Sequence, residues 1–389
     1  MARPDPVIAA LILIVVTGLA VGLWRGEPVS VSAVDGASEL GGVLGGGEGS
    51  DDLSGYRRVT GPRAFRFPAD HAAHPDYRSE WWYYTGNLES EGGRRFGFQL
   101  TFFRFALAPS MPARESRWAS RQAWMAHFAI TDARSGRHYT AERFQRGALG
   151  LAGADASPLR IWLDDWQATG SGTGLFPLHL KAADDGQGLD LTLTSTKPLV
   201  LQGREGYSRK GADPGNASYY YSYTRLTAEG RLSVGGEALP VHGSAWLDRE
   251  WSTSALAPEE AGWDWFALQF DDGRDLMIYR LRRRDGTASR WSAGVIVSPD
   301  GAVRHLGADD FTLESRRWWR SPETGVRYPV GWRVHIPAAD LEFQVEPLVD
   351  NQEMNVAFRY WEGAVTARGR SGSRDLAGRG YLELTGYRR

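Results

Sequence analysis

The sequence predicts an all-β protein made of two antiparallel β-barrels in tandem, preceded by an N-terminal transmembrane segment. Three observations support this fold class. Apolar and polar residues alternate with a period of two, as in residues 189–194 and 341–346, which is typical of strands with one buried face. Turn-forming pairs such as Asp-Gly separate these runs, and long helical periodicity is absent. An aromatic hairpin near residue 80 has a similar counterpart near residue 265, which favours two similar units.

The N-terminal segment is predicted from residues 7–24, an uncharged apolar run of 18 residues. This length is just enough to cross a bilayer, and no clear small-residue cleavage site follows it directly. We therefore expect residues 1–24 to form an uncleaved, single-pass anchor in the cell membrane, with a cleaved signal peptide as the alternative. The soluble domains would then be extracytoplasmic, that is, periplasmic. Residues 25–61 are rich in Gly, Ser and acidic residues, which predicts a flexible tether.

The two barrels are expected over residues 62–235 and residues 236–389. Residues 77–102 contain the first aromatic hairpin and residues 262–281 contain the second, and each has a glycine-containing turn at its centre. Two hairpins of the same design, nearly two hundred residues apart, indicate one barrel for each half of the chain.

Composition limits the classes of function. The net charge is −2, so we expect no nucleic-acid partner. Cysteine is absent, which excludes disulfides, thiolate metal sites and cysteine catalysis. With 16 tryptophans, the chain has large apolar side chains for its cores and for a ligand cavity.

Three acidic residues are candidate catalytic groups. On a strand, Trp246, Asp248 and Glu250 would share one face. Two close carboxylates raise the pKa of one of them, which leaves a proton available near neutral pH. Asp264 stands between two tryptophans, so it could protonate an alkene while the indole faces stabilise the resulting cation. The alternative for these acids is a structural one, in ion pairs with arginines or in hydrogen bonds from the backbone.

Aromatic residues near these acids are candidate ligand contacts, because indole and phenol rings combine an apolar body with a polar tip. Packing in a barrel core is the alternative for each of them, and a hydrogen-bonded core position is the alternative for His127. His71 and His74 lie near prolines in an expected loop, so we expect no metal and no other cofactor. The candidates are Trp82, Tyr84, His127, Tyr221, Trp246, Trp251, Trp263 and Trp265.

Six segments resemble, in the same order, the carotenoid 1,2-hydratase and AttH-like family of secreted proteins. The resemblance runs from about residue 65 to residue 389 and implies a tandem of two lipocalin-like β-barrels. Arg249 stands where the hydratases of the family carry a histidine. The segments are residues 80–88, 126–132, 210–225, 246–251, 360–365 and 380–387.

We therefore expect a membrane-anchored, lipocalin-like protein that binds or acts on a lipophilic small molecule, a lipid or an isoprenoid. If it is an enzyme, we expect acid-initiated hydration or hydrolysis without a cofactor, in which Asp248 or Asp264 protonates a double bond and water adds. The alternative is a non-catalytic lipid-binding module that passes its ligand to a membrane partner such as an ABC-type transporter.

Overall fold

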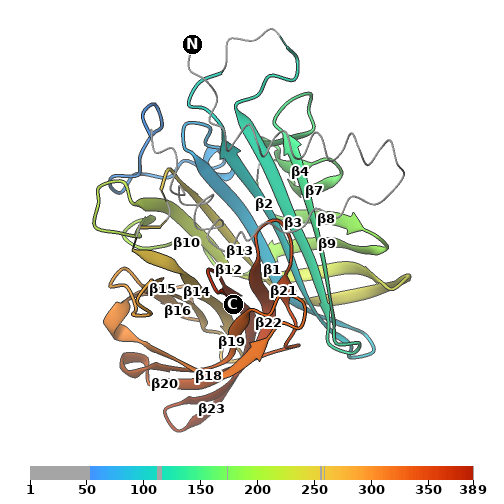
Figure 1. The fold of residues 1–389 in the computed structure, drawn as a ribbon. Coiled ribbons are helices and arrows are strands. Elements are labelled where there is room, and N and C mark those ends of the chain that lie inside the picture. Colours follow the sequence, from blue (N-terminus) through green and yellow to red (C-terminus); the bar gives the residue numbers. More distant parts are fainter. Residues whose placement is uncertain (1–52, 112–115, 173, 255, 258, 389) are drawn as a thin grey trace. The chain divides into compact units, whose positions relative to one another are not determined.

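The computed structural model describes residues 53–388, except 112–115, 173, 255 and 258. Within this part, regular structure is almost entirely β-strand, in two antiparallel sheets of 13 and 10 strands (Figure 1). The predicted all-β class is confirmed. No helix here has the length and hydrophobicity needed to cross a bilayer, and the predicted anchor, residues 7–24, lies outside the described residues. The helices are three 3-10 turns, η2 (Ala69–His71), η3 (Ala308–Asp310) and η4 (Pro337–Ala339).

The first sheet follows the path β4-β3-β2-β1-β13-β12-β9-β8-β7-β6-β5, with β10 and β11 paired to β12. Its long strands therefore lie side by side in the middle of the sheet. Its strands are β1 (Ser79–Ser90), β2 (Arg95–Ala106), β3 (Gln122–Asp132), β4 (Arg137–Arg146), β5 (Ala152–Ala156), β6 (Leu159–Leu163), β7 (Trp166–Gly170), β8 (Leu178–Asp184), β9 (Gln187–Ser195), β10 (Val200–Leu201), β11 (Tyr207–Arg209), β12 (Ala217–Val234) and β13 (Glu237–Ser252).

The second sheet follows the path β17-β16-β15-β14-β23-β22-β20-β19-β18, with β21 paired to β22. Its central strand β14 lies between β15 and β23, much as β1 lies between β2 and β13 in the first sheet. Its strands are β14 (Glu260–Phe270), β15 (Asp275–Arg283), β16 (Ala293–Val297), β17 (Val303–Gly307), β18 (Thr312–Arg320), β19 (Arg327–Ile336), β20 (Leu341–Pro347), β21 (Glu353–Met354), β22 (Tyr360–Ser371) and β23 (Arg374–Leu384).

The two predicted aromatic hairpins are confirmed. They are β1–β2 and β14–β15, each paired in antiparallel register across its glycine-containing turn. The change of sheet, however, falls between Ser252 and Glu260. The expected division after residue 235 lies instead inside the β12–β13 hairpin, because β13 pairs with both β12 and β1 of the first sheet.

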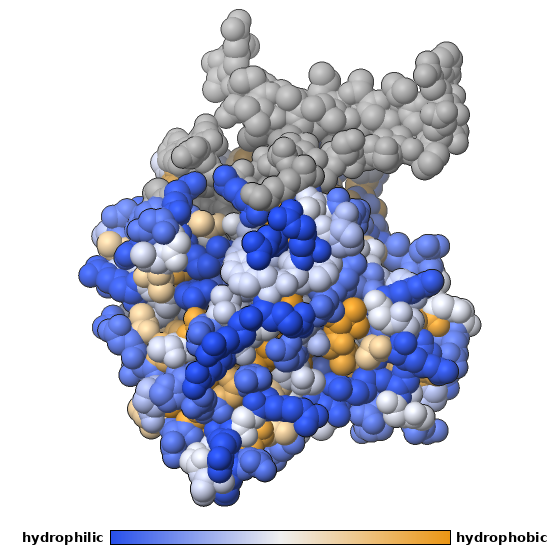
Figure 2. Space-filling model, turned by 60° about the horizontal axis from the view of Figure 1, so that its bottom comes forward, coloured by the Kyte–Doolittle hydropathy of each residue, from blue (hydrophilic) through white to orange (hydrophobic). Residues whose placement is uncertain are grey.

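Both sheets are curled, and each encloses its own apolar core. Among the described residues no ladder joins β4 to β5 or β17 to β18, so neither sheet is closed by continuous pairing. The first core includes Trp82 and Tyr84 of β1, and the second includes Phe266 of β14. Figure 2 shows that hydrophilic side chains cover much of one outer face of the molecule, with small apolar patches among them.

A third apolar layer lies where the two sheets meet. It joins Tyr83 of β1 and Trp246 of β13 to Trp265 of β14 and Tyr381 of β23. Since side chains alternate along a strand, the residues that face this layer are the neighbours of those in the two cores. The central strands are therefore apolar on both faces, and a pocket opens within the shared layer.

Candidate functional site

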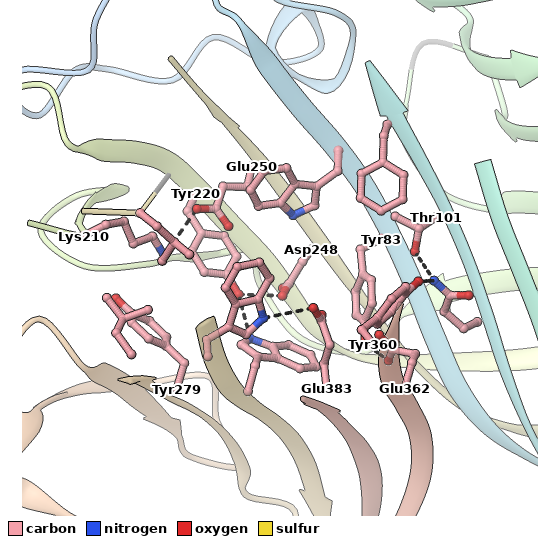
Figure 3. Close-up of a pocket in the computed structure, with 17 residues that line it drawn as sticks. Tyr83, Thr101, Lys210, Tyr220, Asp248, Glu250, Tyr279, Tyr360, Glu362 and Glu383 are labelled. Atoms are coloured by element: carbon pink, nitrogen blue, oxygen red, sulfur yellow. Dashed lines mark hydrogen bonds and ion pairs between the residues drawn. The ribbon is translucent and has the colours of Figure 1, made fainter. Parts of the chain in front are cut away.

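The pocket is built by both sheets, with walls that are mostly aromatic and acidic (Figure 3). Its empty space is about 800 Å³ when the part at its open side, which is continuous with solvent, is included. Four carboxyl groups and one ammonium group face it. The lining residues are Trp81, Tyr83, Gln99, Thr101, Phe103, Lys210, Tyr220, Asp248, Glu250, Leu256, Trp263, Trp265, Tyr279, Leu281, Tyr360, Glu362 and Glu383.

Asp248 of β13 is held by three uncharged donors. Its Oδ1 accepts hydrogen bonds from Ser222 Oγ at 2.5 Å and Trp246 Nε1 at 2.7 Å, and its Oδ2 accepts one from Tyr220 Oη at 2.5 Å. No ion pair among the described residues includes it. Burial raises the pKa of Asp248 to about 7, although the three hydrogen bonds oppose the rise. Its carboxyl group can therefore exist in both protonation states near neutral pH.

Glu250, two residues further along β13, has a different environment. Its Oε1 lies 3.3 Å from the ammonium nitrogen of Lys210 and accepts a hydrogen bond from Ser218. The Lys210 ammonium also lies 4.4 Å from the centre of the Tyr279 ring. Burial alone would lower the pKa of Lys210, but the charges of Glu250 and Tyr279 outweigh burial, so the pKa is raised and the ammonium is retained. Glu250 is thus the paired carboxylate of the pocket.

Glu362 and Glu383 reach the pocket from the second sheet. They stand directly opposite each other on β22 and β23. Tyr83 Oη donates a hydrogen bond to Glu362 at 2.7 Å, and Trp263 Nε1 donates one to Glu383 at 2.9 Å. Burial raises the pKa of Glu383 to about 8, with a further rise from the charges of Asp248 and Glu250. Burial, together with the charge of Glu383, also raises the pKa of Glu362 well above its ordinary value.

His127 lies behind the pocket wall. Its Nδ1 is 2.7 Å from the hydroxyl of Tyr360, which lines the pocket. Its Nε2 has no hydrogen-bond partner among the described residues and lies 3.9 Å from a carboxylate oxygen of Glu142. Burial lowers the pKa of His127 to about 3, so the imidazole is neutral at physiological pH. His127 therefore contacts the pocket lining through Tyr360 and through the ring of Phe103, whose centre lies 5.2 Å from that of the imidazole.

Five of the predicted site residues meet at the pocket. Asp248, Glu250, Trp263 and Trp265 line it. Trp246 lies just behind and donates its indole hydrogen to Asp248. The expected shared face of β13 is confirmed, because Leu247, Arg249 and Trp251 do not appear among the lining residues.

Four predicted aromatic contacts lie elsewhere. Trp82, Tyr84, Tyr221 and Trp251 are buried in the core of the first sheet. They are sequence neighbours of pocket residues, and the alternation of a strand sends them to the opposite face. Their packing is dense, with Trp251 stacked on His74 at a ring distance of 3.9 Å.

Asp264 is also away from the pocket. It alternates with Trp263 and Trp265 on β14 and is fully buried on the side of the second core. Its carboxylate is paired with Arg280 at 2.7 Å and with Arg282 at 3.1 Å, and it accepts a hydrogen bond from Tyr387. The structure thus places Asp264 in an ion-pair cluster with two arginines, whereas the structural alternative for Asp264 was hydrogen bonding from backbone N–H groups.

Several pocket residues were not predicted, chiefly Lys210, Tyr220, Tyr360, Glu362 and Glu383. The sequence does indicate that two of these residues, Glu362 and Glu383, are unusual. Each stands among apolar residues at the end of a long strand, where an acid on a buried face needs an explanation. Packing of the β22–β23 hairpin on the first sheet, which brings the glutamates to the pocket, is not visible in the sequence.

No metal site is evident in this part of the chain. Within the described ranges, no group of three or more His, Cys, Asp or Glu residues is arranged to hold a metal ion. The carboxyl groups of the pocket are instead occupied by tyrosine, serine, tryptophan and lysine donors.

Comparison with solved structures agrees with this architecture. A protein of Nitrosomonas europaea described as an AttH is 38% identical, with a TM-score of 0.75 over 85% of this chain and 100% of that chain. Kievitone hydratase of Nectria haematococca has the same fold, with a TM-score of 0.61 over 84% of this chain and 97% of the other, at 15% identity.

Sequence comparison points the same way. The dehydratase asqC of Emericella nidulans is 27% identical over 212 residues, which is 50% of this chain. The match spans only 57% of the length of that dehydratase. The profile of the AttH-like family matches residues 58–387, nearly all of the part that the structure describes. The chain therefore belongs to the AttH-like family.

Proposed function

We propose that this protein is an enzyme that adds water to, or removes water from, an apolar unsaturated molecule bound in the pocket. The observation that carries the proposal is Asp248. Its carboxyl group is buried among aromatic side chains, has only uncharged donors, and has a pKa of about 7. A group that both gives and takes a proton near neutral pH is what acid–base catalysis of this reaction requires.

In the hydration direction, the Asp248 carboxyl transfers its proton to one carbon of a double bond. The π electrons form the new C–H bond, and the neighbouring carbon becomes a carbocation. Trp263 and Trp265 supply aromatic surface that favours this charge. A water molecule then forms the C–O bond and releases a proton, which returns to the Asp248 carboxylate. Dehydration is the same path in reverse.

The relatives support the class of reaction. One sequence relative is a dehydratase, and a solved protein of the same fold is a hydratase, so water transfer is a chemistry that this architecture accommodates. The binding of an apolar substrate is supported by the aromatic residues that line the pocket.

The test is isotope incorporation by the purified full-length protein. A panel of isoprenoid alkenes and the corresponding tertiary alcohols is incubated in heavy-oxygen water, and products are analysed by mass spectrometry. We expect one labelled oxygen in each alcohol formed from an alkene and loss of water from the alcohols in the reverse direction, and neither reaction with Asp248→Asn. Asp190→Asn, which changes an exposed acid on β9, is the matched control and should keep full turnover.

A non-catalytic carrier would behave differently. It would retain lipophilic molecules through purification, exchange no oxygen with any member of the panel, and lose ligand when the aromatic lining is changed. If no member of the panel is converted and a lipophilic ligand co-purifies with the protein, a non-catalytic carrier function replaces the enzyme proposal.

We also propose that residues 7–24 anchor the protein in the membrane with the pocket outside the cytoplasm, because this run is uncharged and long enough to span. Fractionation of cells that express the full chain tests this. Recovery in the soluble fraction would contradict the anchor without affecting the proposed reaction.

A further inference from the structure

The two glutamates of the second sheet form an unusual pair. Glu362 and Glu383 are direct cross-strand neighbours, an arrangement in which like charges repel. Ion pairs among the described residues include neither of them. Instead, Glu362 accepts a hydrogen bond from the hydroxyl of Tyr83, and Glu383 accepts one from the indole N–H of Trp263. The pair therefore lacks a positive counter-charge within this part of the chain.

One carboxyl oxygen of the pair, Oε2 of Glu362, is available to interact with a bound ligand. Glu362 is fully buried, and its Oε2 has no hydrogen-bond partner among the described residues. Burying such an acceptor without a partner is unfavourable. Both glutamates line the pocket, so a ligand there can reach them (Figure 3).

The surroundings suit a positive charge. Tyr83, Trp263, Trp265 and Tyr360 line the same space, and aromatic faces attract cations. The pocket already holds one cation in this way. The ammonium of Lys210 lies 3.3 Å from Glu250 and 4.4 Å from the Tyr279 ring centre. Lys210 is the only basic residue among the described residues that line the pocket, and its partner is Glu250 rather than the glutamate pair.

We propose that the Glu362–Glu383 pair binds a positively charged group on the ligand, so that the pocket prefers apolar organic ammonium ions to neutral molecules of the same shape. This inference rests on the same pocket as the proposed function and adds the charge of the ligand. A bound cation favours the ionised form of both carboxyl groups, so binding should release a proton at neutral pH.

Two benzyl alcohols with the same shape test the inference, since 3-(trimethylammonio)benzyl alcohol is charged, 3-tert-butylbenzyl alcohol is neutral, and neither gains or loses a proton between pH 5 and pH 9. Isothermal titration of the full-length protein gives both affinities, and buffers of different ionisation heat count released protons. We expect the cation to bind at least about tenfold more tightly, which is the lower end of the coupling found for close charge pairs at interfaces. Proton release should accompany the cation only.

The double variant Glu362→Gln/Glu383→Gln keeps the shape of both side chains and removes their charge. We expect its affinity ratio to fall towards one and its proton release to vanish. Glu314→Gln, an exposed acid on β18 of the same sheet, is the matched control and should behave as the wild type.

A measurement on the wild type covers the case in which the double variant does not fold. The affinity ratio should rise between pH 5 and pH 9 as Glu362 and Glu383 lose their protons. The other titratable groups that face this space include Asp248, Glu250, Lys210, Tyr83 and Tyr360. Equal affinity for both benzyl alcohols at every pH would overturn the inference and leave the proposed function standing. If neither benzyl alcohol binds, the inference fails, and isotope incorporation decides the proposed function separately.

Discussion

Asp248 and Arg249 are adjacent in the chain but lie in opposite surroundings. The Asp248 carboxyl faces the pocket and meets only uncharged donors. The Arg249 guanidinium is fully buried on the other face of β13, where it pairs with Glu80 and lies 4.0 Å from the Trp82 ring centre. The residue that follows Asp248 therefore packs on the opposite side of β13, in the first core. The two neighbours should respond differently to substitution.

Glu80→Gln should destabilise the fold strongly. Glu80 is fully buried between Arg104 and Arg249, and its loss as a carboxylate leaves two buried guanidinium groups without a counter-charge. Breaking a buried ion pair in this way costs about 3–5 kcal/mol. Denaturant unfolding measures the change, and adding Arg249→Met should recover part of it. A loss below about 1 kcal/mol, the range of exposed pairs, would contradict the buried network.

Tyr360→Phe should affect both stability and the pocket. The substitution removes the hydroxyl that pairs with His127 Nδ1 and leaves a buried imidazole with no hydrogen-bond partner on either nitrogen among the described residues. We expect a loss of about 1–3 kcal/mol in the free energy of unfolding. In a double-mutant cycle with His127→Leu, the combined loss should be smaller than the sum. Additive losses would show that the two side chains are not coupled.

At the scale of the strand, alternation explains what the sequence could and could not predict. The period of two correctly places Trp246, Asp248 and Glu250 on one face of β13. It cannot say which face meets a cavity, because the central strands are apolar on both faces. Trp82 and Trp251 look as suitable for a ligand as Trp263 and Trp265, yet they fill a core.

The close contact between β14 and β23 depends on glycine. A Cβ added to Gly380 would lie 1.9 Å from the carbonyl oxygen of Ala267 on the neighbouring strand. Gly380→Ala should therefore push β23 away from β14, lower the melting temperature and disturb Glu383 three residues further on. Thermal unfolding and the binding of 3-(trimethylammonio)benzyl alcohol report on the two effects. Gly92→Ala is the control, since its added carbon would meet only one atom, at 3.9 Å; equal behaviour of both variants would contradict the steric argument.

At the scale of the whole molecule, the strands, both aromatic hairpins and the all-β class could be predicted, because they depend on local pattern. The site could be predicted only in part. Its first-sheet acids share one strand and so share a visible pattern, whereas Glu362 and Glu383, on the β22–β23 hairpin, reach the pocket through packing of one sheet on the other. Packing between sheets has no period in the sequence.

Protons held in the pocket should make the molecule less stable as pH rises. The unfolded chain releases carboxyl protons near pH 4, whereas folded Asp248 and Glu383 keep theirs to about pH 7 and about pH 8. At these two groups the folded state binds more protons in this window, which lowers the free energy of unfolding as pH rises. Below about pH 6.5 the residues His71, His127 and His138 oppose this effect, because burial lowers their pKa values to about 4, about 3 and about 3 while the unfolded chain still binds their protons. The net fall is therefore expected above about pH 6.5. Below pH 4 the free energy of unfolding falls as pH falls. Burial would raise the pKa of Asp132, but hydrogen bonds from Arg94 lower it to about 2, so folded Asp132 stays ionised where the unfolded residue is protonated.

Melting temperatures from pH 3 to pH 9 test this linkage. We expect the melting temperature to decline between about pH 6.5 and pH 8, and this decline to flatten in the variant Asp248→Asn/Glu383→Gln. The single variant Asp190→Asn, on the exposed face of β9, should follow the wild-type curve. A wild-type melting temperature that rises steadily from pH 6.5 to pH 8 would show that these carboxyl groups are ionised in the folded protein.

The two-faced strands have a consequence for how this chain can change over evolutionary time. Residues that hold a core together and residues that meet the ligand occupy alternate positions of the same segments, as Trp82 and Tyr83 do on β1. A substitution at a pocket position alters chemistry while its neighbours go on stabilising the sheet. Descendants of one ancestral scaffold can therefore drift in substrate preference without passing through unfolded intermediates, and identity across such lineages should erode faster at every second residue.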